Sequence, residues 1–161
     1  MNDRDKPAAG IEGVAGHFTY WTSMLGIYLL FGTLFFYSGK EKTFDGLGMP
    51  DGLKKQFEGT FLETVPGLDA SWTILGIFEL AIFALTVISV LTGEFLPNKR
   101  KPVLFAALGL SVLTFAMLAV GDNLTGEHEG VASLFLYAAG TAVFMLLLRH
   151  LPPYGRLFED D

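Results

Sequence analysis

The sequence predicts an all-α fold: a polytopic membrane four-helix bundle with an amphipathic extramembrane helix between spans 1 and 2. Apolar residues make up 51% of the 161 residues, and the mean hydropathy of +0.44 is high for a water-soluble domain. Four apolar runs, 19–38, 71–92, 102–120 and 131–148, each approach the ~20 residues that an α-helix needs to cross a bilayer. These observations exclude a soluble enzyme with a large core.

The segment before the first span, residues 1–18, is polar and rich in Gly and Asp. It lacks the short apolar run and the small-residue cleavage site of a secretory signal. We therefore expect the first span itself to direct insertion, with 1–18 as a cytoplasmic N-terminal segment.

Lys and Arg residues set the expected orientation, because the short cytoplasmic flanks of membrane helices are enriched in them. With four spans both termini lie on one side. That side, with the second connection, holds seven cations against four: Arg4, Lys6, Lys99, Arg100, Lys101, Arg149 and Arg156 against Lys40, Lys42, Lys54 and Lys55. We expect a multi-pass protein of the inner (plasma) membrane with both termini in the cytoplasm.

The longest connection, 39–70, carries apolar residues at helical spacing beside charged ones. This pattern predicts an amphipathic helix over 52–65, lying either on the lipid surface or on the end of the bundle. The second connection is short and is bracketed by Gly93, Pro97 and Pro102, so spans 2 and 3 should be antiparallel neighbours. Residues 149–161 form an acidic tail that we expect in the cytoplasm.

Charge and cysteine content narrow the function. The net charge is −6 and no block of basic residues is present, so nucleic acid is not an expected partner. The chain has no cysteine, which excludes disulfides, thiolate metal sites, iron–sulfur clusters and a cysteine nucleophile within it. We expect no metal site: His128 stands between Glu127 and Glu129, where helical neighbours point apart, while His17 and His150 flank membrane ends.

Glu79 is the first candidate site residue, because it lies inside the second span among apolar neighbours. A carboxylate there costs at least ~2.5 kcal/mol unless it is paired or hydrated. The candidate partners are Lys42 and Lys40, since the first span ends on the same side of the membrane. Such a pair serves either as a structural staple between two helices or as part of a working pocket.

Four further residues are candidates for a ligand site near Glu79. Gly76 lies one turn before Glu79 on the same helix face, where a glycine permits close approach by a backbone or a ligand. Asp122 ends the third span on the same side and either joins the cluster or begins a solvated turn. Tyr28 and Tyr137 lie within spans, where their hydroxyls either line a groove for quinone or a lipid tail or bond a neighbouring helix.

Two short motifs resemble those of the DoxX-like family of small four-helix membrane proteins. The first span ends in Gly39-Lys40-Glu41-Lys42, similar to that family's Gly-x-x-Lys, and the second contains Gly76-Ile77-Phe78-Glu79-Leu80, similar to its Gly-x-x-Glu-Leu. An amphipathic segment ending near Pro66 and a Gly-rich basic turn over 93–101 also match. The resemblance covers about residues 22–148, and the acidic tail and polar N-terminal extension depart from it.

The resemblance implies a non-catalytic integral membrane subunit or companion of a quinone-linked respiratory oxidoreductase complex, with Lys42 and Glu79 as the paired residues. It implies no covalently bound cofactor. Quinone or lipid is the expected noncovalent ligand, and membrane lipid and other subunits of a redox complex are the expected partners. Two alternatives stay open: a small-molecule, proton or lipid-handling protein acting as a homo-oligomer, and a structural or stress-related protein with no ligand.

Overall fold

The computed structural model describes residues 9–45, 48–64 and 67–151, and within these the fold is all-helical. Four helices are long and apolar enough to cross a membrane: α1 (Ala9–Thr43), α3 (Leu68–Leu91), α4 (Pro102–Thr125) and α5 (His128–His150). Each predicted span lies on one of them, and each helix extends beyond its span at one or both ends. The predicted all-α membrane bundle is confirmed.

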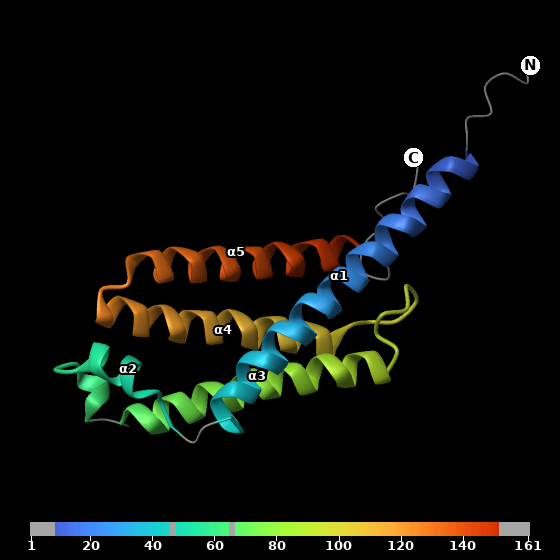
Figure 1. Cartoon of the computed structure of the whole chain (residues 1–161). Helices are drawn as coiled ribbons and strands as arrows, with labels where there is room; N and C mark the ends of the chain where they lie inside the picture. Colours follow the sequence, from blue (N-terminus) through green and yellow to red (C-terminus); the bar gives the residue numbers. More distant parts are fainter. Residues whose placement is uncertain (1–8, 46–47, 65–66, 152–161) are drawn as a thin grey trace, which may run out of the picture.

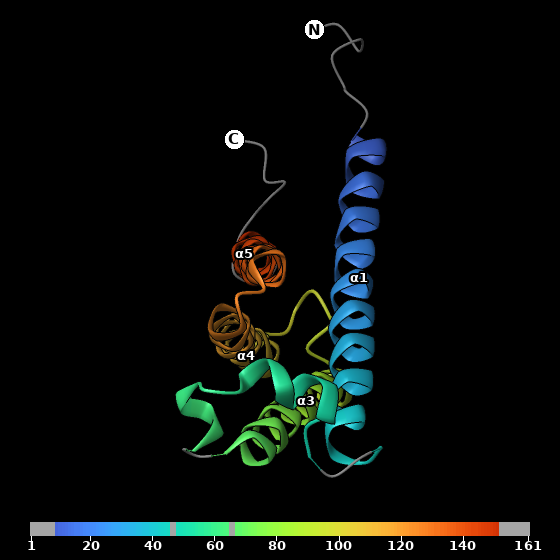
Figure 2. The same ribbon diagram turned by 60° about the vertical axis from the view of Figure 1, so that its left-hand side comes forward.

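The helices α3, α4 and α5 run side by side in a row, and α1 crosses one side of this row obliquely (Figures 1 and 2). Along the row α3 packs on α4 and α4 on α5, while α1 packs mainly on α3. The start of α1, the end of α5 and the α3–α4 connection lie at one end, which we call the terminal end. The α1–α3 and α4–α5 connections lie at the other, which we call the cap end.

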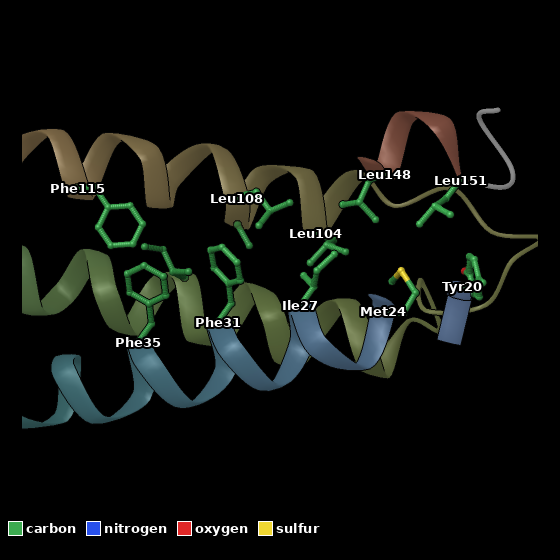
Figure 3. Packing of buried hydrophobic residues seen from close by; sticks show 12 residues of the cluster. Tyr20, Met24, Ile27, Phe31, Phe35, Leu104, Leu108, Phe115, Leu148 and Leu151 are labelled. Atoms are coloured by element: carbon green, nitrogen blue, oxygen red, sulfur yellow. The ribbon is translucent and has the colours of Figure 1, made fainter. Parts of the chain in front are cut away.

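The core is built mainly between α1 and α4. The inward stripe of α1 repeats at intervals of three or four residues and consists of Tyr20, Met24, Ile27, Phe31 and Phe35. It faces Leu104, Leu108 and Phe115 of α4 and, at the terminal end, Leu148 and Leu151 (Figure 3). Because lipid is as apolar as these side chains, close packing rather than hydrophobic exclusion stabilises this contact.

The buried stripe of α3 is different in chemistry: it consists of Gly76, Glu79, Ile82, Thr86 and Ser89. Small and polar residues at helix interfaces in membranes allow close approach and interhelical hydrogen bonds. The polar groups that this protein buries therefore lie largely along one face of α3.

The connection between α1 and α3 is not the single amphipathic helix expected over 52–65. It contains a short helix α2 (Asp51–Lys54) and two 3-10 turns, η1 (Lys55–Phe57) and η2 (Phe61–Glu63). The helix is interrupted because Glu58 is extended and Gly59 has a φ of 78°, a left-handed conformation that favours glycine. We call residues 48–64 the cap segment.

The cap segment lies on the bundle, which answers the question that the sequence left open. Phe57 is buried and packs against Gly121 near the end of α4. Asp69 ties the segment to the start of α3: its carboxylate accepts from the Met49 amide at 2.8 Å and pairs with Lys54 at 2.9 Å.

Both predicted terminal segments lie partly outside the described residues. The helix α1 begins at Ala9, so the second half of the predicted N-terminal segment is helical. Of the predicted acidic tail, Arg149 and His150 belong to α5. Residues 1–8 and 152–161 are not described.

Candidate functional site

A buried ion pair joins α1 to α3 near the cap end. The Lys42 ammonium lies 3.1 Å and 3.0 Å from the two carboxylate oxygens of Glu79, and the side chains are 8% and 2% exposed. Lys42 stands in the last turn of α1, where the negative end of the helix dipole favours a cation. The predicted pairing of Glu79 with a lysine of the first span is confirmed, and the partner is Lys42.

Two neighbouring groups complete this site. Ser38, one turn before Lys42, donates to Glu79 Oε1 at 2.9 Å and accepts from Lys42 Nζ at 2.7 Å. The Trp72 ring lies on the remaining side, with its centroid 5.0 Å from Lys42 Nζ, a cation–π contact. Both charges are therefore desolvated and provided with partners, which offsets the cost of burying them.

Reciprocal glycine contacts make this short distance between the helices possible. A Cβ on Gly39 would lie 3.0 Å from the backbone nitrogen of Leu80, the residue after Glu79. A Cβ on Gly76 would lie 2.8 Å from the Cβ of Lys42 and 2.8 Å from a methyl group of Thr43. Each glycine thus admits the segment of the other helix that carries the paired charge. The expected role of Gly76 in close approach is confirmed, and the group that approaches is the α1 backbone.

Lys40 does not join this site. Its ammonium lies 2.7 Å from the Asp45 carboxylate, and this pair is about half exposed. Lys40 and Lys42 are two positions apart on a helix, so their side chains point in different directions, and only Lys42 faces α3. The sequence-based expectation of Lys40 as a cation beside Glu79 is corrected accordingly.

The two tyrosines lie elsewhere. Tyr28 bonds Ser89 at 2.7 Å, and Ser89 stands ten residues beyond Glu79 on α3, about 15 Å along the helix. Tyr137 is 55% exposed on α5, and its ring packs against Phe115. The structure does not bring either tyrosine to Glu79, and Tyr28 instead bonds a neighbouring helix.

A second buried carboxylate, Glu94, organises the terminal end of the bundle, and the sequence analysis missed it. Glu94 is 5% exposed and accepts from the amides of Val103 and Leu104, at 3.0 and 2.8 Å. These are amides of the first turn of α4, which have no partner within the helix, and the helix dipole favours an anion there. Ser89 also donates to Glu94 at 2.8 Å. A chain from Tyr28 through Ser89 to Glu94 therefore connects α1, α3 and α4.

Lys101 is buried beside this network, although the sequence placed it among the solvated cations of the loop. It is 0% exposed and donates to the carbonyls of Leu96 and Lys99 at 3.3 and 3.0 Å. Its ammonium lies 5.5 Å from the centre of the Tyr20 ring. Burial lowers the pKa of Lys101 below 10.5, and the charge of Glu94 acts in the opposite direction. The available signal was that Glu94 is the one acidic residue in an otherwise basic connection that precedes a helix-starting proline.

Asp122 lines a cavity of about 380 Å³ at the cap end, under the cap segment and between α3 and α4. Trp72 also lines this cavity, so one ring contacts both the cavity and Lys42. Asp122 therefore belongs to a neighbouring space and not to the Lys42–Glu79 site itself. Among the described residues, no three or more His, Asp and Glu side chains are placed to hold a metal ion.

Comparison with protein-family models, with curated proteins and with solved structures found no match for this chain.

The geometry of the Lys42–Glu79 site favours a structural role. Both Glu79 oxygens lie within hydrogen-bonding distance of Lys42, and Ser38 takes a further position on Oε1. A carboxylate that exchanges protons or binds a cation needs a path to water or to the ligand, and Glu79 is 2% exposed. What this arrangement does chemically is fix the crossing of α1 over α3.

Proposed function

We propose that this chain is a DoxX-like, non-catalytic integral membrane subunit or companion of a quinone-linked respiratory oxidoreductase complex. The observation that carries the proposal is the meeting of the two motif halves, Gly39-x-x-Lys42 and Gly76-x-x-Glu79, in one reciprocal contact. Each glycine admits the helix that bears the opposite charge, which gives the four motif positions a common physical purpose. This supports the resemblance on which the proposal depends.

A supporting observation is the exposure of α5. Its described buried residues are Thr141 and Leu148, whereas large apolar side chains such as Phe135 and Leu136 are 71% and 68% exposed. In a bilayer such a helix contacts either lipid or another membrane protein. Partner subunits would carry the redox cofactors, and the four-helix bundle would supply a rigid membrane anchor.

We further propose that the protein lies in the inner (plasma) membrane with the terminal end in the cytoplasm. The exposed cations Lys99 and Arg100 lie at that end. The positive-inside rule supports this orientation.

The test is extraction of the tagged, full-length chain in a mild detergent from its native membrane, followed by native mass spectrometry. We expect a stoichiometric complex that contains a redox protein and retains quinone-linked activity. A tagged four-span protein of unrelated sequence from the same membrane is the control for nonspecific capture. Recovery of the chain alone or as a homo-oligomer, with no redox protein, would overturn the proposal.

The second candidate, a small-molecule or lipid-handling membrane protein, is favoured by the cavity beside Asp122. A homo-oligomer in the same extraction would agree with it. This candidate requires that the cavity bind a ligand, which can be measured directly.

A further inference from the structure

The cavity at the cap end has the dimensions and the lining of a ligand pocket. Its volume of about 380 Å³ lies in the range of small-molecule sites, roughly 300–1,000 Å³. Most of its wall is apolar, with Phe57 and Leu62 from the cap segment, Trp72 and Leu75 from α3, and Met117 and Leu118 from α4. Three separate parts of the chain therefore enclose an apolar space next to the end of the membrane-spanning helices.

The polar groups of the cavity identify the head group that it would accept. Asp122 is the one ionisable residue among those lining it, and no described cation pairs with the Asp122 carboxylate. The Thr125 hydroxyl is directed to the Asp122 carbonyl at 3.1 Å, which leaves it less free to bind a ligand. A carboxylate accepts hydrogen bonds and attracts positive charge, so it favours a head group that donates and disfavours an anionic one.

We propose that this cavity binds a single-chain amphiphile whose head group donates hydrogen bonds, such as a long-chain alcohol or amine, and discriminates against the carboxylic acid of the same chain length. The alkyl chain packs against Trp72, Leu75 and Leu118, and the head group lies beside Asp122. This inference is independent of the proposed redox partner, since it concerns a ligand of this chain alone.

Occupancy of the cavity is coupled by contact to the ion pair. Trp72 covers Lys42 on one side and lines the cavity on the other. A ligand that packs against the ring holds it over Lys42, so binding should stabilise the crossing of α1 and α3 and raise the thermal unfolding temperature in proportion to occupancy.

The two tryptophans of the chain provide the measurement and its control. Trp72 lines the cavity, while Trp21 packs on Phe95 at the terminal end. In the Trp21→Phe variant, in phosphatidylcholine nanodiscs, Trp72 fluorescence is titrated with bromine-terminated long-chain alcohol, amine and carboxylic acid. The Trp72→Phe variant, which retains Trp21, reports quenching by probes that have only entered the bilayer.

We expect saturable quenching of Trp72 by the alcohol and the amine, and about tenfold weaker binding of the acid. Trp21 should show only gradual, unsaturable quenching. In the Trp21→Phe background, Asp122→Asn should bring the amine and the acid close to equal affinity. Gly121→Leu should abolish saturation, because a Cβ at Gly121 lies 3.6 Å from the Phe57 ring and a longer side chain extends into the cavity.

Three results would overturn the proposal: Trp72 quenching that matches Trp21, an acid that binds as tightly as the amine, or saturation that survives in folded Gly121→Leu. The first two comparisons need no cavity variant, so a Gly121→Leu protein that does not fold leaves the proposal testable. A negative result here would not alter the expected co-purification of a redox protein.

Discussion

Glu79 and Lys42 are charged residues whose stability depends on each other. Each is less than a tenth exposed, and the bonds to Ser38 and the contact with Trp72 complete their surroundings. Removing one charge leaves the other buried without a counter-charge, whereas removing both leaves neither. The distinction between a structural staple and an incidental contact can therefore be measured as a coupling energy.

We expect Glu79→Gln and Lys42→Met each to lower the free energy of unfolding by about 3 kcal/mol. The double variant should lose clearly less than the sum, with a coupling of about 1–3 kcal/mol. Unfolding by SDS in mixed micelles measures these values. The exposed Lys40–Asp45 pair at the same helix end is the matched control, and a cycle with Lys40→Met and Asp45→Asn should give a coupling of about 0.5 kcal/mol or less. Equal coupling in the two pairs would contradict the staple.

Lys101 gives a prediction of opposite character, because burial lowers its pKa from 10.5. As the pH rises toward 10.5, the folded protein releases this proton before the unfolded chain does. The unfolded chain then binds more protons, so the free energy of unfolding should increase with pH in this interval. The slope should disappear in Lys101→Met, and the difference between wild type and variant removes the contribution of other groups. A difference that is constant with pH would contradict the lowered pKa.

At the scale of elements, the α1–α3 crossing depends on two glycines that differ from others in the same helix. A Cβ at Gly39 or Gly76 would meet atoms of the opposite helix at 3.0 Å or less, whereas a Cβ at Gly26 or Gly32 has nothing within 4 Å. The contact at Gly39 is with backbone, which cannot rotate away. The same substitution should therefore have opposite effects at different positions of one helix.

We expect Gly39→Ala and Gly76→Ala each to destabilise the bundle by about 1–3 kcal/mol, because the helices must separate and lengthen the Lys42–Glu79 distance. Gly32→Ala should be neutral or should stabilise by up to about 1 kcal/mol, because alanine favours a helix over glycine. Thermal unfolding in the same detergent for all three variants is the measurement. A loss in Gly32→Ala as large as that in Gly39→Ala would show that helix propensity, not close approach, governs these positions.

At the scale of the whole molecule, the sequence predicted what long-range apolar runs and single buried charges determine. The four spans followed from length and hydropathy, and the pairing of Glu79 followed from the cost of a carboxylate in lipid. The choice of Lys42 over Lys40 required the rotation of α1 against α3, which the sequence pattern does not fix.

The terminal end shows why other features could not be predicted. Glu94 and Lys101 lie in a short connection that reads as solvated, and they are buried because the chain folds back over the start of α4. The breaks in the cap segment at Glu58 and Gly59 likewise depend on its docking on α4 through Phe57. In both places a local pattern was overridden by tertiary contacts.

Orientation in the membrane is a whole-molecule property, and the absence of cysteine from the chain allows a direct test of it. Glu58 and Asn98 are exposed, at the cap end and the terminal end respectively, so each can be replaced by cysteine without disturbing the core. In intact spheroplasts a membrane-impermeant maleimide should label Glu58→Cys, whereas Asn98→Cys should be labelled only after permeabilisation. Because the cysteine-free chain gives no background, the two single variants control for one another. Labelling in the reverse order would place the termini outside and invert the orientation that Lys99 and Arg100 favour.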